Sequence, residues 1–249
     1  MNRLSPPEDG LISPRQGKND PRLGMDALMV AVPSALNSLV RRMGARPIPF
    51  SDGGLYGLYV SARGAIPPLA LSGPFLGAPH AVMGMEKLIA LGARRFWFLG
   101  WCGSLQSRLR VGDLILPTGA LSEEGTSRHY PIGNRKSTSD PELNRRLGQA
   151  LQRQGVAFSH GTIWTTDAPY RETPAKIERY QNRGILAVEM ETSALMTLAV
   201  FRAVQMTGLL VVSDELFDGS WHPGFSSQAL KQGTRVAGDT LFHLAQGMT

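Results

Sequence analysis

Short apolar runs that alternate with helical patterns are the feature of this sequence that most limits its fold. The first run, Ala27–Val32, is apolar at every position, as expected of a strand covered on both faces of a sheet. The other expected strands are Leu55–Ser61, Pro68–Ser72, Phe96–Leu99, Asp113–Leu116, Gly161–Thr165, Ile185–Val188 and Leu209–Val212. Helices are expected over His80–Leu91, Pro141–Gln154, Thr173 to Gly184, about Glu191 to Ala203, and from about Ser226 onward. This order predicts an α/β fold, a single-domain three-layer sandwich in which helices cover a mixed central β-sheet.

The first 25 residues differ in composition from the rest of the chain. Prolines and glycines interrupt them, which prevents a continuous helix and favours an extended segment. These residues are Pro6, Pro7, Gly10, Pro14, Gly17, Pro21 and Gly24. Two interpretations stay open, a loosely ordered tail and an arm that lies across its own or a neighbouring subunit. We therefore expect an N-terminal arm over residues 1–25 and one α/β domain over residues 26–249.

Charge and cysteine content exclude several classes of protein. The formal net charge is +6, but the basic residues occur in scattered pairs such as Arg41–Arg42 and Arg94–Arg95. A nucleic-acid partner is not expected, because its binding face needs clustered basic residues. The charge fits either a solvated basic surface or a requirement for anionic ligands. Cys102 is the single cysteine, so a disulfide framework and a multi-cysteine metal site are excluded and no metal site is expected.

Targeting signals and membrane spans are also not expected. No apolar run approaches the roughly 18 residues that a membrane helix needs. The first ten residues, MNRLSPPEDG, lack the basic-then-apolar order of a secretory signal. The sequence therefore predicts a cytoplasmic protein with no membrane partner.

In sheets of this kind ligands bind beyond the carboxyl ends of the strands, so the candidate site residues are those that follow each apolar run. Gly100-Trp101-Cys102-Gly103 follows the FWFL strand. A turn with paired glycines lets the backbone approach a ligand and present N–H groups to an anion, although a tight turn without function has the same composition. Cys102 has no histidine nearby in the sequence, which favours a buried structural thiol over a nucleophile.

Two carboxylates follow the ILAV strand, at Glu189 and Glu191 on either side of Met190. If the strand continues through Glu191 both side chains point to the same side, whereas they diverge if the helix has already begun. A carboxylate there can accept hydrogen bonds from a diol, such as the hydroxyls of ribose. The alternative is favourable negative charge at a helix N-terminus.

Acidic and basic residues also follow two other strands. Asp214 comes after the LLVV strand, where partial desolvation would raise its pKa and suit it to act as a general acid, or where it caps the next segment. The run from Thr166 to Glu172, which contains Asp167 and Arg171, lies between a strand and a helix. It is typical of a ligand-binding loop or of an ion-paired surface loop.

Taken in order, these segments resemble the nucleoside phosphorylase family over roughly residues 26 to 246. That family contains purine nucleoside and uridine phosphorylases and the methylthioadenosine-type nucleosidases. The matching segments are GWCGSL (100–105), VGDLILPTGALSEEGTS (111–127), TTDAPYRET (165–173), AVEMETSAL (187–195) and VVSDE (211–215). The VEMET and SD motifs at their separation are specific, and the glycine turn and the GD pair are weaker.

The resemblance implies cleavage of the N-glycosidic bond of a nucleoside through a transition state like a ribosyl oxocarbenium ion. Glu191 would hold ribose hydroxyls, Met190 would pack on the sugar, and Glu189 would line the same pocket. Asp214 would protonate a purine leaving group, whereas Arg171 would match the base-reading region of uridine phosphorylases. These two matches point to different bases, and both a purine and a pyrimidine stay open.

The resemblance also implies the co-substrate and the assembly. Phosphorylases use inorganic phosphate and release ribose 1-phosphate, nucleosidases use water, and neither needs an organic cofactor. The expected partners are therefore a nucleoside and phosphate. Family members are commonly homo-oligomers, so we expect one built from dimers, with a hexamer as one form.

The chain departs from the family at positions that bind phosphate. Val32–Leu36 stands where the family's phosphorylases carry Gly-Asp-Pro-x-Arg, and Phe98 stands where they carry an arginine. Trp101 and Cys102 stand where many members have threonine or serine. Phosphate binding usually needs arginine side chains, so these losses bear on the reaction.

Three explanations remain for the missing arginines: hydrolysis with water, replacement by other basic residues, or a non-catalytic nucleoside-binding paralogue. Arg15, Lys18 and Arg63 are the candidate replacements. The sequence predicts a nucleoside phosphorylase, a pentosyltransferase of nucleoside salvage, with a nucleosidase or a binding paralogue as the alternatives.

Overall fold

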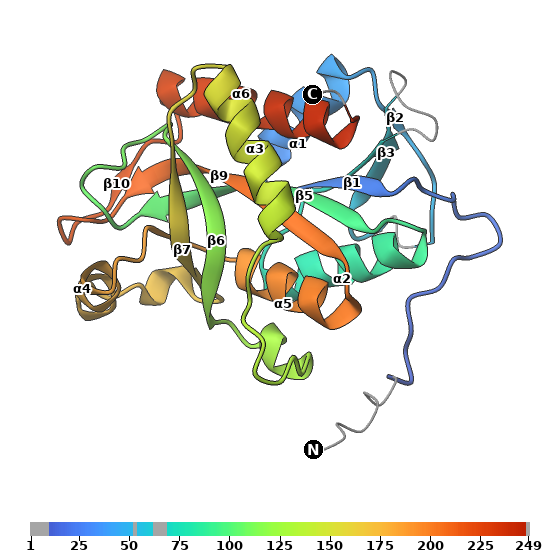
Figure 1. The fold of residues 1–249 in the computed structure, drawn as a ribbon, viewed down its shortest axis with the longest axis horizontal. Coiled ribbons are helices and arrows are strands. Elements are labelled where there is room, and N and C mark those ends of the chain that lie inside the picture. The colour runs from blue at the N-terminus through green and yellow to red at the C-terminus, as the bar shows by residue number, and fades with distance from the viewer. Residues whose placement is uncertain (1–9, 52–53, 62–68, 248–249) are drawn as a thin grey trace.

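One mixed sheet runs through the described part of the protein, as the computed structural model shows for residues 10–51, 54–61 and 69–247 (Figure 1). Its strand order is β10-β9-β6-β7-β8-β5-β1-β4-β3-β2, with a further pairing between β9 and β5. The strands are β1 (Asp26–Val30), β2 (Arg46–Pro47), β3 (Gly57–Val60), β4 (Ala70–Gly73), β5 (Arg95–Ser104), β6 (Leu114–Glu123), β7 (Phe158–Thr166), β8 (Ala187–Glu189), β9 (Gln205–Glu215) and β10 (His222–Pro223).

The sheet closes on itself around β5. Along its length β5 pairs in parallel with β9, and on its other edge it pairs first with β1 and then, at Gly103 and Ser104, with β8. The remaining pairings run from β9 to β6, from β6 to β7 and from β7 to β8. Strands β5, β9, β6, β7 and β8 therefore form a closed ring, and β1, β4, β3 and β2 extend from it as an open sheet.

Helices cover both faces of this sheet (Figure 1). Helices α1 (Pro33–Arg42), α3 (Pro141–Arg153) and α6 (Gln228–Ala245) pack on one face, where Trp97, Leu99 and Leu209 belong to their core cluster. Helices α2 (Ala78–Ala90) and α5 (Thr192–Arg202) pack on the other face, with Phe98 and Cys102 in the cluster they share. Helix α4 (Pro174–Asn182) packs through Ile177 and Tyr180 on a smaller cluster. The predicted three-layer α/β fold is confirmed.

The predicted turn at Gly100–Ser104 is wrong, because β5 continues through Ser104. Its glycines serve close packing within the sheet. A Cβ atom on Gly103 would lie 2.4 Å from Cδ1 of Leu216 and 3.0 Å from Oδ2 of Asp214, and one on Gly100 would lie 3.0 Å from the Phe98 ring. The structure also contains helix α1 and strands β2 and β10, which the sequence pattern does not predict.

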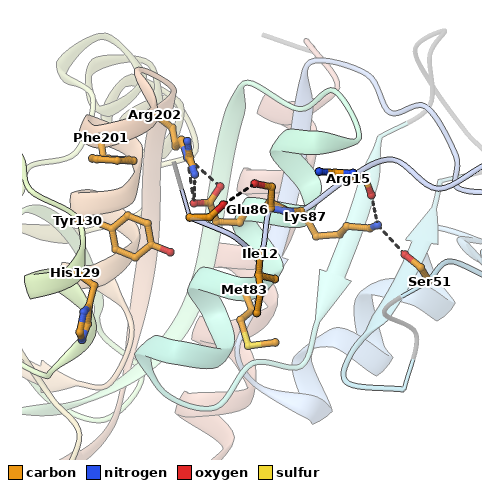
Figure 2. A pocket seen from close by; sticks show the side chains of 13 residues that line it. Ile12, Arg15, Ser51, Met83, Glu86, Lys87, His129, Tyr130, Phe201 and Arg202 are labelled. Atoms are coloured by element: carbon orange, nitrogen blue, oxygen red, sulfur yellow. Dashed lines mark hydrogen bonds and ion pairs between the residues drawn. The ribbon is translucent and has the colours of Figure 1, made fainter. Parts of the chain in front are cut away.

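Residues 10–25 of the predicted arm lie against α2 of the same chain. The amide of Leu23 donates to the carbonyl of Leu91 at 2.8 Å. Nζ of Lys87, on α2, donates to Oδ2 of Asp20 and to the carbonyl of Arg15, each at 2.6 Å, and the Lys87 and Asp20 side chains are only 3% and 4% exposed. Figure 2 shows Lys87 pointing toward Arg15 and Ser51, beside a cavity of about 600 Å³ between the arm and helices α2 and α5.

Replacing Asp20 with Asn is expected to loosen this arm and to lower the free energy of unfolding by about 1–3 kcal/mol, because Lys87 keeps a buried charge with a weaker acceptor. Lys87 holds the pKa of the Asp20 carboxyl well below its ordinary value of 3.8, so the stabilisation is complete above that value and is lost as the pH falls. Urea unfolding and limited proteolysis measure both effects. Lys18→Gln is the control, and equal protease sensitivity of the two variants would contradict the role of Asp20.

Candidate active site

The strand register brings the acidic residues of two distant motifs to one edge of the closed ring. Gly103 on β5 lies between Val188 on β8 and Asp214 on β9. Because neighbouring strands lie about 4.8 Å apart, Val188 and Asp214 are roughly 10 Å apart across Gly103. The carboxylates that follow Val188 and the carboxylate of Asp214 are therefore placed at the same end of the sheet.

Glu191 connects the N-terminal ends of α5 and α2. It occupies the position just before α5, and its Oε1 accepts a 2.6 Å hydrogen bond from the amide of Gly77, the residue just before α2. The side chain is buried, and burial together with the negative charge of Glu189 raises its pKa to about 8. A buried carboxyl that holds a proton near neutral pH and lies beside helix N-termini is suited to bind hydroxyl groups.

Glu189 caps α5. Its Oε2 accepts hydrogen bonds of 2.8 Å from the amides of Glu191 and Thr192 and from the Thr192 hydroxyl, and Oε1 accepts one of 2.5 Å from Thr165. Strand β8 ends at Glu189, so of the two arrangements considered for the pair, the strand does not continue through Glu191. Desolvation raises the pKa of Glu189 despite these donors. The geometry matches the helix N-terminus reading of Glu189, and a direct role in substrate binding stays a prediction.

Asp214 is held by one donor on each carboxylate oxygen. The Ser213 hydroxyl donates to Oδ1 at 2.7 Å, and Nε1 of Trp221 donates to Oδ2 at 3.0 Å. Asp214 is half-buried, whereas Trp221 is 60% exposed. The carboxylate is thus fixed in orientation at the border between the interior and the solvent.

Glu172 joins this group, although the sequence analysis did not select it. Burial and the negative charge of Asp214 raise the pKa of Glu172 to about 7, while Lys176 opposes the shift. Glu172 is therefore close enough to Asp214 to be affected by its charge, and its raised pKa suits it to proton transfer near neutral pH. Its place in the polar run from Thr166 to Glu172 is the sequence signal that points to it.

The other predicted site residues are divided between the two faces of the sheet. Cys102 is buried near the acids: desolvation first, and then Asp214 and Glu189, raise the pKa of its thiol, which fits a structural residue. Met190 is half-buried directly between the two glutamates. Trp101 faces the opposite side, where its Nε1 donates to the Thr234 hydroxyl on α6 at 2.9 Å. The structure therefore separates Trp101 from the acidic group.

Asp167 and Arg171 lie on the surface of the loop that leads to α4. Oδ2 of Asp167 accepts a 2.8 Å hydrogen bond from the amide of Gly125, and this bond fastens the loop to the end of β6. Arg171 is exposed at the end of a short 3-10 turn, Pro169–Arg171. Neither side chain contacts Asp214 in the hydrogen bonds and ion pairs of the described residues.

Comparison with known proteins places the chain in a family. The sequence profile of the Phosphorylase superfamily matches residues 28–245. The chain belongs to this superfamily. One curated relative is guanosine phosphorylase of Halorubrum lacusprofundi. It is 30% identical to this chain over 145 residues, which are 58% of the chain and 60% of that protein. A DeoD-type purine nucleoside phosphorylase of Bacillus cereus is 30% identical over 168 residues, which are 67% and 69% of the two proteins.

Solved structures of the superfamily share the fold. Uridine phosphorylase from Vibrio fischeri superposes with a TM-score of 0.79 at 22% identity, over 95% of this chain and 98% of that one. Purine nucleoside phosphorylase from Toxoplasma gondii gives 0.79 at 19% identity, over 96% of each chain. The predicted family resemblance is thus confirmed, with the α/β architecture that it implied.

The positions at which the family resemblance leads us to expect phosphate-binding arginines are filled by apolar packing. Phe98 is 1% exposed in the core cluster between the sheet and helices α2 and α5. Val32 precedes α1, and Ala35 is buried in its first turn. Among the cation–π contacts of the described residues, none involves Phe98.

Of the basic residues that the sequence suggests as replacements for the missing arginines, two lie in the arm and one lies outside the described residues. Arg15 and Lys18 are exposed in the arm, whose described contacts are with α2 and Ser51. Arg63 lies outside the described residues.

The described residues contain no cluster of histidine, cysteine and acidic side chains that would bind a metal ion. In the same part of the chain, no helix has the length and apolar character of a membrane span.

Proposed function

We propose that this chain is a purine nucleoside phosphorylase, a pentosyltransferase that transfers the ribosyl group of a purine nucleoside to inorganic phosphate. The observation that carries the proposal is the placement of Asp214 and the VEMET carboxylates on either side of Gly103. Membership in the phosphorylase superfamily supports it, and curated relatives named for guanosine and purine nucleosides favour a purine substrate.

In the proposed reaction the bond between C1′ of ribose and the purine nitrogen breaks, and its electron pair stays with the base. Asp214 donates a proton to the departing base, and Glu172 beside it resupplies that proton. A phosphate oxygen forms the new bond to C1′, which gives ribose 1-phosphate. Glu191 binds the ribose hydroxyls, and positive charge on the sugar favours its ionised form.

The geometry of the polar loop also favours a purine over a pyrimidine. Arg171, the residue matched to uridine phosphorylases, is exposed, whereas Glu172 is the member of that loop whose pKa responds to Asp214. A carboxyl group whose pKa is raised to about 7 is suited to supply a proton to a basic ring nitrogen. A purine offers such a nitrogen on its five-membered ring.

Hydrolysis is the second candidate, and the packing around Phe98 favours it. An apolar side chain stands where the family's phosphorylases carry an arginine, so the phosphate dianion has fewer partners there. Water needs no cationic pocket.

Incubation with a panel of nucleosides, with and without phosphate, separates the two reactions. We expect purine nucleosides to give free base and ribose 1-phosphate only when phosphate is present. Free ribose formed at equal rates in both conditions would establish the nucleosidase instead. Tight nucleoside binding without turnover would identify a non-catalytic paralogue.

Replacing Glu172 with Gln is expected to change the pH dependence of kcat near neutrality. In the wild-type enzyme the resupplying group must hold a proton, so kcat falls as the pH rises through about 7, the raised pKa of Glu172. Gln cannot titrate, so the variant lacks this step and has a lower kcat below pH 7. The matched control is Glu178→Gln on the exposed surface of α4. If kcat of the Glu172 variant still falls as the pH rises through about 7, another group is responsible for that fall.

The assembly and location of the protein remain proposals as well. Leu55, Leu76 and Met83 have exposed apolar side chains near the start of α2, where the backbone of Leu55 and of Leu76 hydrogen-bonds with the His80 ring. A second copy of the chain would cover them, which supports a homo-oligomer close to Gly77 and Glu191. Light scattering during size-exclusion chromatography tests this, and a monomer would reject it. A cytoplasmic location stays a prediction of the sequence.

A further inference from the structure

The two carboxylate oxygens of Asp214 lie in different surroundings. Oδ1 accepts a hydrogen bond from the hydroxyl of Ser213, a buried residue of the same strand. Oδ2 lies over Gly103, because a Cβ atom on that glycine would be 3.0 Å from Oδ2 and 3.4 Å from Cγ1 of Val188. Oδ2 is therefore the oxygen that faces the space between the ends of β8 and β9, on the side of the VEMET carboxylates.

Trp221 occupies this oxygen in the structure. Its Nε1–H donates to Oδ2 of Asp214 at 3.0 Å, although the Trp221 side chain is 60% exposed. A hydrogen bond donated to a carboxylate stabilises the ionised form of that group. In the proposed reaction Asp214 must instead carry a proton on the oxygen that faces the base. The indole N–H and the base therefore compete for the same oxygen.

The backbone on both sides of Trp221 is anchored, so its side chain is the part that can move. Trp221 directly precedes β10, which pairs antiparallel with Asp214 and Glu215 at the end of β9 (Figure 1). Before Trp221 in the chain, the carbonyl of Phe217 accepts a 2.7 Å hydrogen bond from Nε2 of Gln181 on α4. Exposed side chains change rotamer without movement of the backbone. The indole can thus leave Oδ2 while β10 stays in place.

An aromatic neighbour remains available to the indole after it leaves Oδ2. The ring centroids of Trp221 and Phe225 lie 6.2 Å apart with an interplanar angle of 57°, and Phe225 is itself 50% exposed. Aromatic rings with centroids about 4.5–7 Å apart attract each other. Packing on Phe225 therefore offsets part of the hydrogen bond that Trp221 gives up.

We propose that Trp221 is a positioning residue that acts through Asp214: its indole N–H holds Oδ2 in the free enzyme, and a purine takes its place on that oxygen. The inference rests on the proposed function, since it requires a purine beside Asp214. On binding, the hydrogen bond from Nε1 of Trp221 breaks, and Oδ2 forms one with the ring nitrogen that receives the proton. Trp221 thereby lowers the affinity for the purine and takes no part in the proton transfer itself.

Fluorine NMR of the full chain labelled with fluorotryptophan follows the indole directly. The chain has four tryptophans, and the signal that is absent from Trp221→Phe belongs to Trp221. We expect saturating hypoxanthine, a free purine base, to shift this signal, whereas ribose 1-phosphate, which has no base, leaves it in place. Calorimetric titration with each ligand establishes saturation. A Trp221 signal that stays in place while hypoxanthine binds would overturn the proposal.

Steady-state kinetics with inosine and phosphate test the same competition independently. Trp221→Phe keeps an aromatic ring and removes the N–H, so KM is expected to fall about threefold or more, because the base no longer displaces a charge-assisted hydrogen bond. Tyr170→Phe, which removes a polar hydrogen from a fully exposed aromatic residue, is the matched control and should keep the wild-type KM. A merely structural role of Trp221 would raise KM or lower kcat. Either result, in a variant that thermal unfolding shows to be folded, would overturn the proposal.

These experiments separate the inference from the proposed function. If the wild type releases no base from inosine and binds no hypoxanthine, the proposed function fails and the inference fails with it. If the wild type cleaves inosine but neither the Trp221 signal nor KM responds as expected, the role of Trp221 alone is refuted.

Discussion

Replacing Asp214 with Asn is expected to lower kcat for a purine nucleoside by about 10²- to 10⁴-fold, the usual contribution of a general acid. The Asn amide accepts a hydrogen bond from Trp221 as Asp214 does, so the fold and the orientation of the side chain are expected to persist. The amide cannot transfer a proton to the departing base. The loss should therefore appear in kcat, with a smaller effect on KM.

Asp218→Asn is the matched control, because Asp218 is an exposed aspartate that pairs with His222 a few residues further along. It should cleave purine nucleosides at the wild-type rate. Ribosides whose leaving group needs no proton, such as nitrophenyl ribosides, should be cleaved by Asp214→Asn with little loss. A wild-type rate for purines in Asp214→Asn would remove this residue from the mechanism.

Replacing Glu191 with Gln is expected to weaken nucleoside binding and, at the same time, to stabilise the protein above pH 8. The buried carboxyl has a pKa near 8, so the folded protein holds a proton there that the unfolded chain has released. Stability contributed by this group is therefore complete below its ordinary pKa of 4.5 and is lost as the pH rises through about 8. Gln is neutral at every pH, so the variant should lose less stability at high pH.

The two effects of Glu191→Gln are measured separately. Urea unfolding between about pH 5 and about pH 9 covers the pKa shift. The free energy of unfolding should depend less on pH in the variant than in the wild type. KM for the nucleoside, measured above the pKa of about 8 at which Glu191 ionises, should rise about tenfold or more, because a neutral amide holds the ribose hydroxyls less strongly than a carboxylate. Glu178→Gln again serves as the control. Parallel pH profiles would show that Glu191 is ionised in the folded protein.

Much of the fold follows from the apolar pattern, and the differences have local causes. The runs at Ala27–Val32 and Leu209–Val212 form central strands because they are covered on both faces. At Gly100–Ser104 the pattern suggested a turn, but Gly103 lacks a side chain because Leu216 and Asp214 occupy that space. A glycine required by packing and a glycine required by a turn are identical in sequence, and only the register of β5, β8 and β9 distinguishes them.

The candidate site was partly visible in the sequence. The sequence predicts Glu191 and Asp214 because each follows a buried strand, and the register of the sheet brings the ends of these strands together. Glu172 cannot be predicted in the same way, because its raised pKa depends on burial and on Asp214, which is distant in the sequence. The face on which Trp101 lies was also not predictable, since it depends on the pleat of β5 continuing beyond the expected strand end.

The closed ring of β5, β9, β6, β7 and β8 has a consequence for how the protein is made. Its first strand begins at Arg95, but the strand that closes it, β9, begins only at Gln205. A chain emerging from the ribosome therefore carries β5 with one long edge unpaired until most of the polypeptide has been synthesised. Apolar β5 residues such as Phe96 and Phe98 are then exposed to solvent unless a chaperone binds them. Synthesis that stops before Gln205 should yield an aggregating product rather than a smaller folded protein.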